Sequence, residues 1–202
     1  MQKTLIINGH QPYDFSEGGL NSAFVERAVA QLQELGHRIQ VTEVAKGYDV
    51  EAEVARHQWA DNVIMQFPVN WMGVPWSFKK YIDEVYTAGL DGRMCANDGR
   101  VAENPKANYG TGGSLTNGRY MMSVTFNAPR EAFDDAQEPF FRGASVDDML
   151  FPMHLNARFV GLSPLPTFAA FDVMKNPETD SDLANWDAHL NTVFAAAAAP
   201  AA

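Results

Sequence analysis

The 202-residue chain has little of several things that define whole classes of protein. Its single cysteine, Cys95, cannot form an internal disulfide and fits a reducing compartment. Only 15 lysines and arginines stand against 25 acidic residues, and the resulting net charge of −10 disfavours nucleic acid and anionic membrane surfaces as partners. The apolar run Leu5–Ile7 is far too short for a secretion signal or a membrane span. We therefore expect a cytoplasmic protein without nucleic-acid partners or stable membrane insertion.

Catalytic signatures that depend on side-chain spacing are also lacking. The five histidines are scattered without metal-ligand spacing, so we predict no metal site and interpret them as structural or solvated. His154 alone is considered as a residue that could reach a substrate. The chain contains neither a G-x-G-x-x-G fingerprint nor a Walker loop. Chemistry carried by a bound organic cofactor stays open.

Short apolar runs alternate with helical patterns along the chain. Gly36 is expected to end the first helix, Pro152 predicts a kink or a late start in the fourth, and residues 89–118 form a long polar loop. Strands are predicted at residues 4–8, 38–44, 62–67, 120–126 and 165–171, and helices at 20–35, 50–59, 76–88, 145–161 and 180–194. This order predicts one α/β domain at residues 1–194, a doubly wound five-stranded parallel sheet with helices on both faces. The Ala-rich tail, residues 195–202, is left out of the fold as a helix end or disorder.

Ligands of such sheets bind at the carboxyl ends of the strands, where three segments of this chain are expected. Residues 9–21 bring small residues ahead of a helix, where a phosphate can bind; an ordinary helix start is the alternative. Residues 68–75 leave Trp71 and Met72 on a loop, where they either contact a planar ligand or fill the core. Residues 125–129 follow a buried strand and carry backbone amides. If the planar ligand is a flavin, these amides would face its pyrimidine edge, where reduction places negative charge. Phe126 there either stacks on the ring or fills space.

Seven sequence segments together resemble one protein family over nearly the whole chain. They are LIING, SEGGLN, AEVARHQWAD, FPVNWMGVPWSFKKYIDEVY, YGTGGSLTNGRYM, TFNAP with the following EAF, and LPTF. The chain is similar to the flavodoxin-like NAD(P)H:quinone oxidoreductases, most closely those of the modulator of drug activity B type. Asn70 departs from the pattern, because family members tend to carry another aromatic residue there.

The resemblance implies a flavodoxin-like fold and a cytoplasmic homodimer that binds FAD and reduces a quinone substrate with NADPH or NADH. Hydride would pass through flavin N5 by a ping-pong mechanism. Tyr109 is the candidate proton donor or substrate-positioning residue, with simple packing in its loop as the alternative. The predicted cofactor-binding residues are Ser16, Glu17, Gly18, Gly19, Leu20, Asn21, Ser22, Ala23, Pro68, Val69, Asn70, Trp71, Met72, Tyr109, Thr125, Phe126, Asn127 and Ala128.

Three other functions remain as alternatives. The first is an FMN-dependent enzyme of azoreductase type, and the second is a flavodoxin-type one-electron carrier. The third is a binding module that keeps the fold but has no catalytic activity. The identity of the bound flavin and turnover with a quinone distinguish them.

Overall fold

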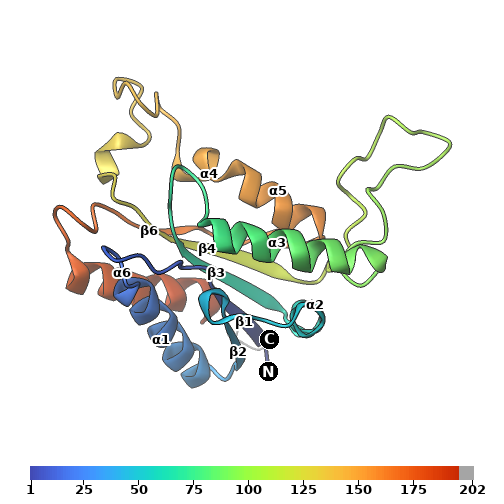
Figure 1. The fold of residues 1–202 in the computed structure, drawn as a ribbon, viewed down its shortest axis with the longest axis horizontal. Helices are drawn as coiled ribbons and strands as arrows, with labels where there is room; N and C mark the ends of the chain where they lie inside the picture. Colours follow the sequence, from blue (N-terminus) through green and yellow to red (C-terminus); the bar gives the residue numbers. More distant parts are fainter. Residues whose placement is uncertain (196–202) are drawn as a thin grey trace, which may run out of the picture.

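The computed structural model describes residues 1–195 as a parallel sheet between two layers of helices (Figure 1). Of the predicted tail at 195–202, all but Ala195 lies outside the described residues. The central strands are β1 (Lys3–Asn8), β3 (Asn62–Pro68) and β4 (Arg119–Thr125), with β2 (Arg38–Glu43) at one edge. The strand order is β2-β1-β3-β4-β5, and every pairing is parallel. This order reverses between β1 and β3, as in the predicted flavodoxin-like fold.

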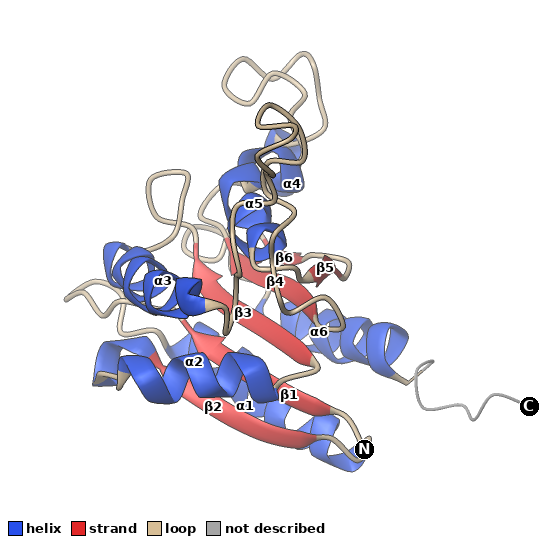
Figure 2. Ribbon diagram, turned by 90° about the vertical axis from the view of Figure 1, so that its right-hand side faces the viewer, coloured by secondary structure: helices blue, strands red, loops and turns tan. Residues whose placement is uncertain are grey.

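Helices cover both faces of the sheet, as Figure 2 shows. One face carries α1 (Gly19–Glu34) and α6 (Thr179–Phe194), and the other carries α2 (Val50–Trp59), α3 (Trp76–Ala88), α4 (Val146–Met149) and α5 (Phe151–Phe159). In β1, Ile6 packs on the α1 and α6 side, whereas Leu5 and Ile7 pack on the opposite side. Successive side chains of a strand point to opposite faces, so a strand covered on both sides needs a continuous apolar run.

Proline interrupts the last predicted strand and the fourth predicted helix; the interruption of the helix was expected at Pro152, whereas that of the strand was not. The strand expected at 165–171 is split into β5 (Ser163–Pro164) and β6 (Phe168–Ala170), which both pair with β4. Pro164 and Pro166 cannot donate to a strand ladder, so the sheet has six short strands rather than five. The helix expected at 145–161 is divided at Leu150, and Pro152 lies in the first turn of α5.

Two further features follow the sequence closely. Gly36 lies just beyond α1 with φ +81, the left-handed geometry expected of a glycine that ends a helix. Residues 89–118 form the predicted long loop, with a single 3₁₀ turn, η2 (Gly89–Asp91), at its start. This loop projects from one end of the molecule (Figure 1). No helix in the described part of the chain is both long and apolar enough to cross a membrane.

Buried His57 makes the stability of the fold depend on pH. Its side chain is fully buried in α2, its Nε2 has no partner among residues 1–195, and burial lowers the pKa of His57 from 6.5 to about 4. The unfolded chain therefore binds a proton in this pH range that the folded chain does not. Lowering the pH from 6.5 to about 4 should cost on the order of 3 kcal/mol of unfolding free energy at this site.

This prediction is checked by chemical denaturation between pH 4 and 8. A His57→Phe variant should lose much of the acid-side slope, because phenylalanine has no proton to gain. His189→Phe is the matched control, since the pKa of His189 is also lowered by burial but its Nε2 has the Pro166 carbonyl as a partner at 3.0 Å. An unchanged slope in His57→Phe would contradict the assignment.

Candidate functional site

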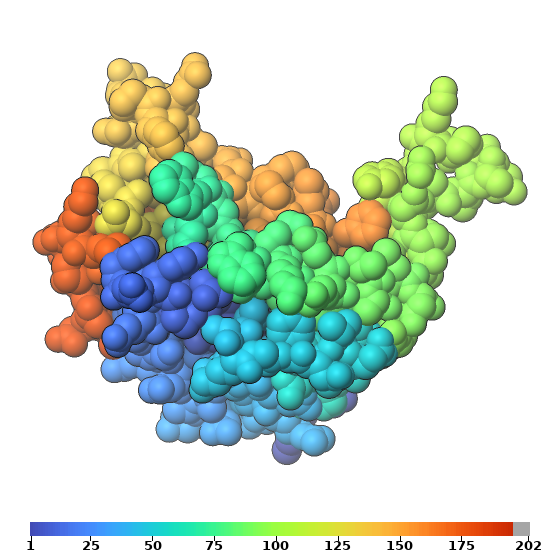
Figure 3. All heavy atoms as spheres, viewed as in Figure 1, coloured from blue at the N-terminus to red at the C-terminus, as the bar shows by residue number. Residues whose placement is uncertain are grey.

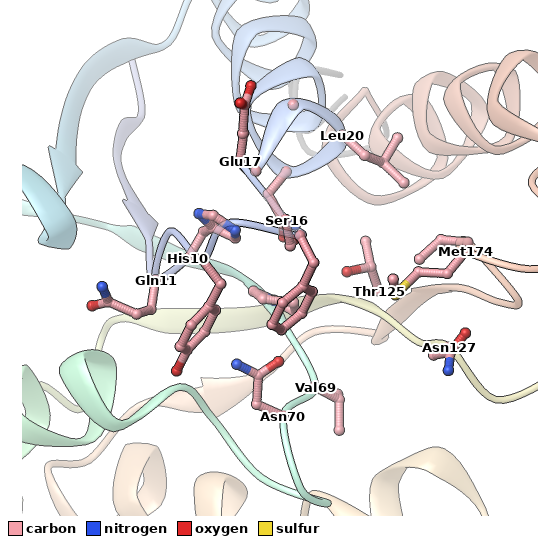
Figure 4. A pocket seen from close by; sticks show the side chains of 17 residues that line it. His10, Gln11, Ser16, Glu17, Leu20, Val69, Asn70, Thr125, Asn127 and Met174 are labelled. Carbon is pink, nitrogen blue, oxygen red and sulfur yellow. The ribbon is translucent and has the colours of Figure 1, made fainter.

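The three segments expected at the carboxyl ends of the strands meet around one cavity of about 270 Å³ (Figure 4). Parallel pairing sets Pro68 beside Thr125, and the amide of Val69 donates to the Thr125 carbonyl at 2.9 Å. The segment after β1 closes the cavity from the other side. The predicted site residues that line the cavity are Ser16, Glu17, Gly18, Gly19, Leu20, Asn21, Pro68, Val69, Asn70, Thr125 and Asn127.

The N-terminus of α1 forms one wall of the cavity and is left without a side-chain cap. Gly18 occupies the cap position with φ +88, and the first turn carries no acidic residue. The first amides of an α-helix have no acceptor inside the helix, and its dipole favours negative charge there. Asn21 is buried and accepts a hydrogen bond from Gln66 Nε2 at 2.9 Å, which fixes the first turn against β3. The wall is therefore suited to an anionic group such as a phosphate.

His10 is a site residue that sequence reasoning missed. It is only 6% exposed, it lines the cavity, and its Nε2 has no hydrogen-bond partner among the described residues. Burial lowers its pKa, an effect partly offset by a hydrogen bond to the backbone of Ser16. The expectation of a structural or solvated histidine gave no weight to its place directly after the first strand. That place at the rim of the sheet was the available signal.

The loop after β3 makes a tight turn that exposes its aromatic residue. Asn70 and Gly73 exchange backbone hydrogen bonds of 2.9 and 3.1 Å, and the two residues between them have φ of 49° for Trp71 and 59° for Met72. Trp71 is 94% exposed and Met72 is 47% exposed, so the alternative that they fill the core is wrong. Asn70 lines the cavity, whereas Trp71 and Met72 lie at the turn beside it.

The segment after β4 contributes differently from the expectation. Thr125 and Asn127 line the cavity, but Phe126 is buried and stacks on Phe171 at a centroid distance of 5.5 Å. The amide of Phe126 donates to the Ala170 carbonyl at 2.8 Å, so neither its ring nor its amide is free for a ligand. Phe126 fills space, which was the second of its two predicted roles.

Several predicted contacts lie outside the cavity and remain predictions. These residues are Ser22, Ala23, Trp71, Met72, Ala128 and Tyr109. Tyr109 is 70% exposed on the projecting loop, with the Arg100 guanidinium 5.6 Å from its ring centre and the Phe159 ring 5.9 Å away. In Figure 3 this loop stands at the opposite end of the molecule from the segments around the cavity.

The structure also adds cavity residues from a fourth segment. Val173 and Met174 follow β6 and line the cavity, as do Gln11, Tyr13 and Phe15 after β1. The last strand ends at the same rim as the others, so the rule that located the three segments would have found this one too. The end of that strand was predicted within one residue, at 171 against Ala170, but the residues after it were not counted among the site segments.

Nearly the whole chain matches one family model. This model describes a flavodoxin-like fold and matches residues 2–192. An uncharacterized protein of Schizosaccharomyces pombe is 46% identical over 195 residues, which cover 96% of this chain and 98% of that protein. The NADPH:quinone oxidoreductase MdaB of Haemophilus influenzae is 44% identical over 190 residues, which cover 94% of this chain and 98% of that protein.

A solved structure with a bound flavin has a similar fold. General stress protein 14 of Treponema denticola, in complex with FMN, superposes with a TM-score of 0.65 at 21% identity. The superposition covers 95% of this chain and 99% of that one. At this level of identity the likeness concerns the fold.

Proposed function

The chain belongs to the flavodoxin-like fold family and, within it, to the family of MdaB-type NADPH:quinone oxidoreductases, and from this premise we propose that it is an FAD-dependent enzyme that reduces quinones by two electrons with NAD(P)H. One observation carries the proposal. The uncapped N-terminus of α1 opens into the same cavity as the carboxyl ends of β3 and β4. A diphosphate at the helix end and a flat ring on the neighbouring turns suit that arrangement.

The donors around the cavity fit a dinucleotide flavin. The first amides of α1 would hold the diphosphate without net positive charge on the protein. The His10 ring already donates to the Ser16 backbone, so its buried Nε2 would donate to the diphosphate in the protonated ring, the form that a bound anion favours. The ring system would contact Val69, Asn70 and the exposed face of Trp71. Without an acceptor in the described part of the chain, the amide of Asn127 is free to donate where negative charge develops on reduction.

A flavin bound there would supply the redox chemistry of a two-electron transfer from nucleotide to quinone. The chain itself orients the reactants and excludes water. We propose that nucleotide and quinone bind in turn at one place, over the turn formed by Asn70 and Trp71. Turnover would then be of ping-pong type, with no side chain required as a base.

A second copy of the chain would complete this site. A cavity of about 270 Å³ is small beside the ~300–1,000 Å³ usual for small-molecule sites, so a dinucleotide would extend beyond it. Trp71 is exposed at the turn beside the cavity, and Tyr109 is exposed on the projecting loop. We propose a cytoplasmic homodimer in which Tyr109 of one copy reaches the site of the other, where it would position the substrate or donate a proton.

Purified protein tests the proposal directly. We expect it to be yellow, to release FAD on denaturation, and to oxidise NADPH faster when menadione is added. Release of FMN would favour an azoreductase-type enzyme; the Treponema denticola protein of similar fold is in complex with FMN. A stable semiquinone without nicotinamide-dependent turnover would instead indicate an electron carrier. Protein that is colourless and binds neither flavin would overturn the proposal.

Replacing Trp71 by glycine should make the fold more stable and the enzyme slower. Left-handed backbone at a non-glycine residue lowers the stability of the fold by about 1–2 kcal/mol, and Trp71 has this geometry. Because its side chain is 94% exposed, removing that side chain sacrifices almost no buried area. Trp71→Gly should therefore raise the free energy of unfolding by about 1 kcal/mol, while lowering quinone turnover by about tenfold through loss of the aromatic face.

Arg142→Gly is the matched control for this prediction. Arg142 has a similar φ of 55° but does not line the cavity, so glycine there should stabilise the fold and leave turnover unchanged. Urea denaturation and steady-state kinetics with menadione give the two readouts. Equal turnover in Trp71→Gly and in the unsubstituted protein would remove Trp71 from the site.

A further inference from the structure

The cavity wall beyond the N-terminus of α1 is apolar. Leu20 stands in the first turn of α1, and Val173 and Met174 follow β6 on the other side. In Figure 4, Leu20 and Met174 lie together at one end of the cavity, whereas Gln11 and Asn70 lie at the other. The helix end proposed to hold the diphosphate therefore has an apolar surface on the side away from the turn proposed to contact the flavin ring.

Backbone hydrogen bonds hold the Met174 segment in place. The amide of Val173 donates to the Phe126 carbonyl and that of Asp172 to the Ala128 carbonyl, both at 3.0 Å. Asp172 takes a left-handed φ of 51°, and the two residues that follow it line the cavity. These hydrogen bonds fix the backbone just before Met174 beside the segment that follows β4.

The side chains of this wall differ in how far they are buried in the core. Leu20 and Val173 are partly buried against the core between α1, α6 and the sheet. Met174 is 56% exposed and belongs to neither core cluster of the described residues. Its thioether is therefore available to a ligand, and methionine makes favourable contacts with the edges and faces of aromatic rings.

We propose that Leu20 and Met174 form a clamp for the adenine of FAD and so determine the preference for FAD over FMN. The inference rests on the proposed function and adds to it the residues that distinguish the two flavins. FMN ends at the phosphate, so it would leave this wall uncovered. The second phosphate and adenosine of FAD would extend past the helix end and place a flat, apolar base between the two side chains.

The test measures the affinity of deflavinated full-length protein for FAD and for FMN by isothermal titration calorimetry. Met174→Ala should weaken FAD binding about tenfold, a loss of about 1.4 kcal/mol, and change FMN binding by less than about twofold. Met174→Leu should restore most of the FAD affinity, because it keeps an apolar side chain at the wall. Leu90→Ala, which removes a similarly exposed side chain outside the cavity, should change neither affinity.

The outcomes separate the clamp from the proposed function. If Met174→Ala lowered the affinities for FAD and FMN equally, Met174 would contact the part of the molecule that the two flavins share. If it lowered neither affinity, Met174 would lie outside the site. Either result would overturn the clamp and leave the proposed function standing. Unsubstituted protein that binds FMN more tightly than FAD would overturn both the clamp and the proposed dependence on FAD. If that protein bound neither flavin, the proposed function itself would fail. Melting temperatures without flavin should coincide for all variants, because Met174 is largely exposed.

Discussion

Gly18→Ala should abolish flavin retention through purification and weaken the affinity for added flavin by at least about 100-fold, or roughly 3 kcal/mol. A Cβ at position 18 would lie 2.4 Å from the ring of His10, which is itself buried in the cavity wall. At that distance the ring must shift to make room for the methyl group. The substitution thus displaces two of the groups proposed to hold the diphosphate.

Gly36→Ala separates this effect from backbone strain. Gly36 has a φ of +81, close to the +88 of Gly18, but a Cβ there meets no atom within 4 Å. Gly36→Ala should lose about 1 kcal/mol of stability because alanine strains left-handed backbone. Gly18→Ala should lose more than this because its Cβ also displaces the His10 ring, and only Gly18→Ala should lose flavin. Calorimetric titration with FAD and thermal melting supply the two readouts. Full flavin affinity in Gly18→Ala would show that the helix end is not the phosphate site.

Glu53→Ala should destabilise the fold by on the order of 3–5 kcal/mol while leaving flavin affinity unchanged. The Glu53 side chain in α2 is buried and accepts hydrogen bonds from Tyr81 Oη at 2.7 Å, Thr42 Oγ1 at 2.8 Å and Arg56 Nη1 at 2.8 Å. Removing it leaves two buried donors and a half-buried guanidinium without their acceptor. Burial, the largest cause, raises the pKa of Tyr81 well above its usual value and persists in the variant, so the phenol stays protonated and cannot replace the lost carboxylate.

Glu51→Ala is the control from the same helix. The side chain of Glu51 is 68% exposed and pairs with Arg93, so its loss should cost less than about 1 kcal/mol. Urea denaturation gives the stability, and FAD titration below the unfolding transition tests the site. Flavin affinity that fell in Glu53→Ala would indicate that the cluster supports the cavity, although none of its residues lines it.

The fold could be predicted from local patterns because each pattern has one physical cause. The run Leu5–Ile7 is apolar throughout because helices cover both faces of β1, and Gly36 ends α1 because the chain must turn left-handed there. The interruption at Pro164 and Pro166 was harder to anticipate. It depends on which backbone amides face β4, and sequence spacing does not give that register.

The candidate site was predictable only in its outline. The rule that ligands bind at the carboxyl ends of parallel strands selected the segments around Ser16, Asn70 and Thr125, and the structure brings all three to one cavity. The side-chain directions were not predictable. Phe126 points into the core and Trp71 into solvent, although both follow buried strands as aromatic residues on the same rim.

By itself, the sequence determined the alternation of strands and helices, the parallel sheet and the rim where a ligand would bind, because these follow from periodicity and chain order. Only the tertiary structure decided that His10 is buried in the cavity wall with a nitrogen unpartnered among the described residues, that Met174 joins that wall, and that the loop carrying Tyr109 projects away from it. Those facts depend on how segments distant in sequence pack together. Burial and hydrogen-bond satisfaction are properties of that packing and leave no periodic signal in the chain.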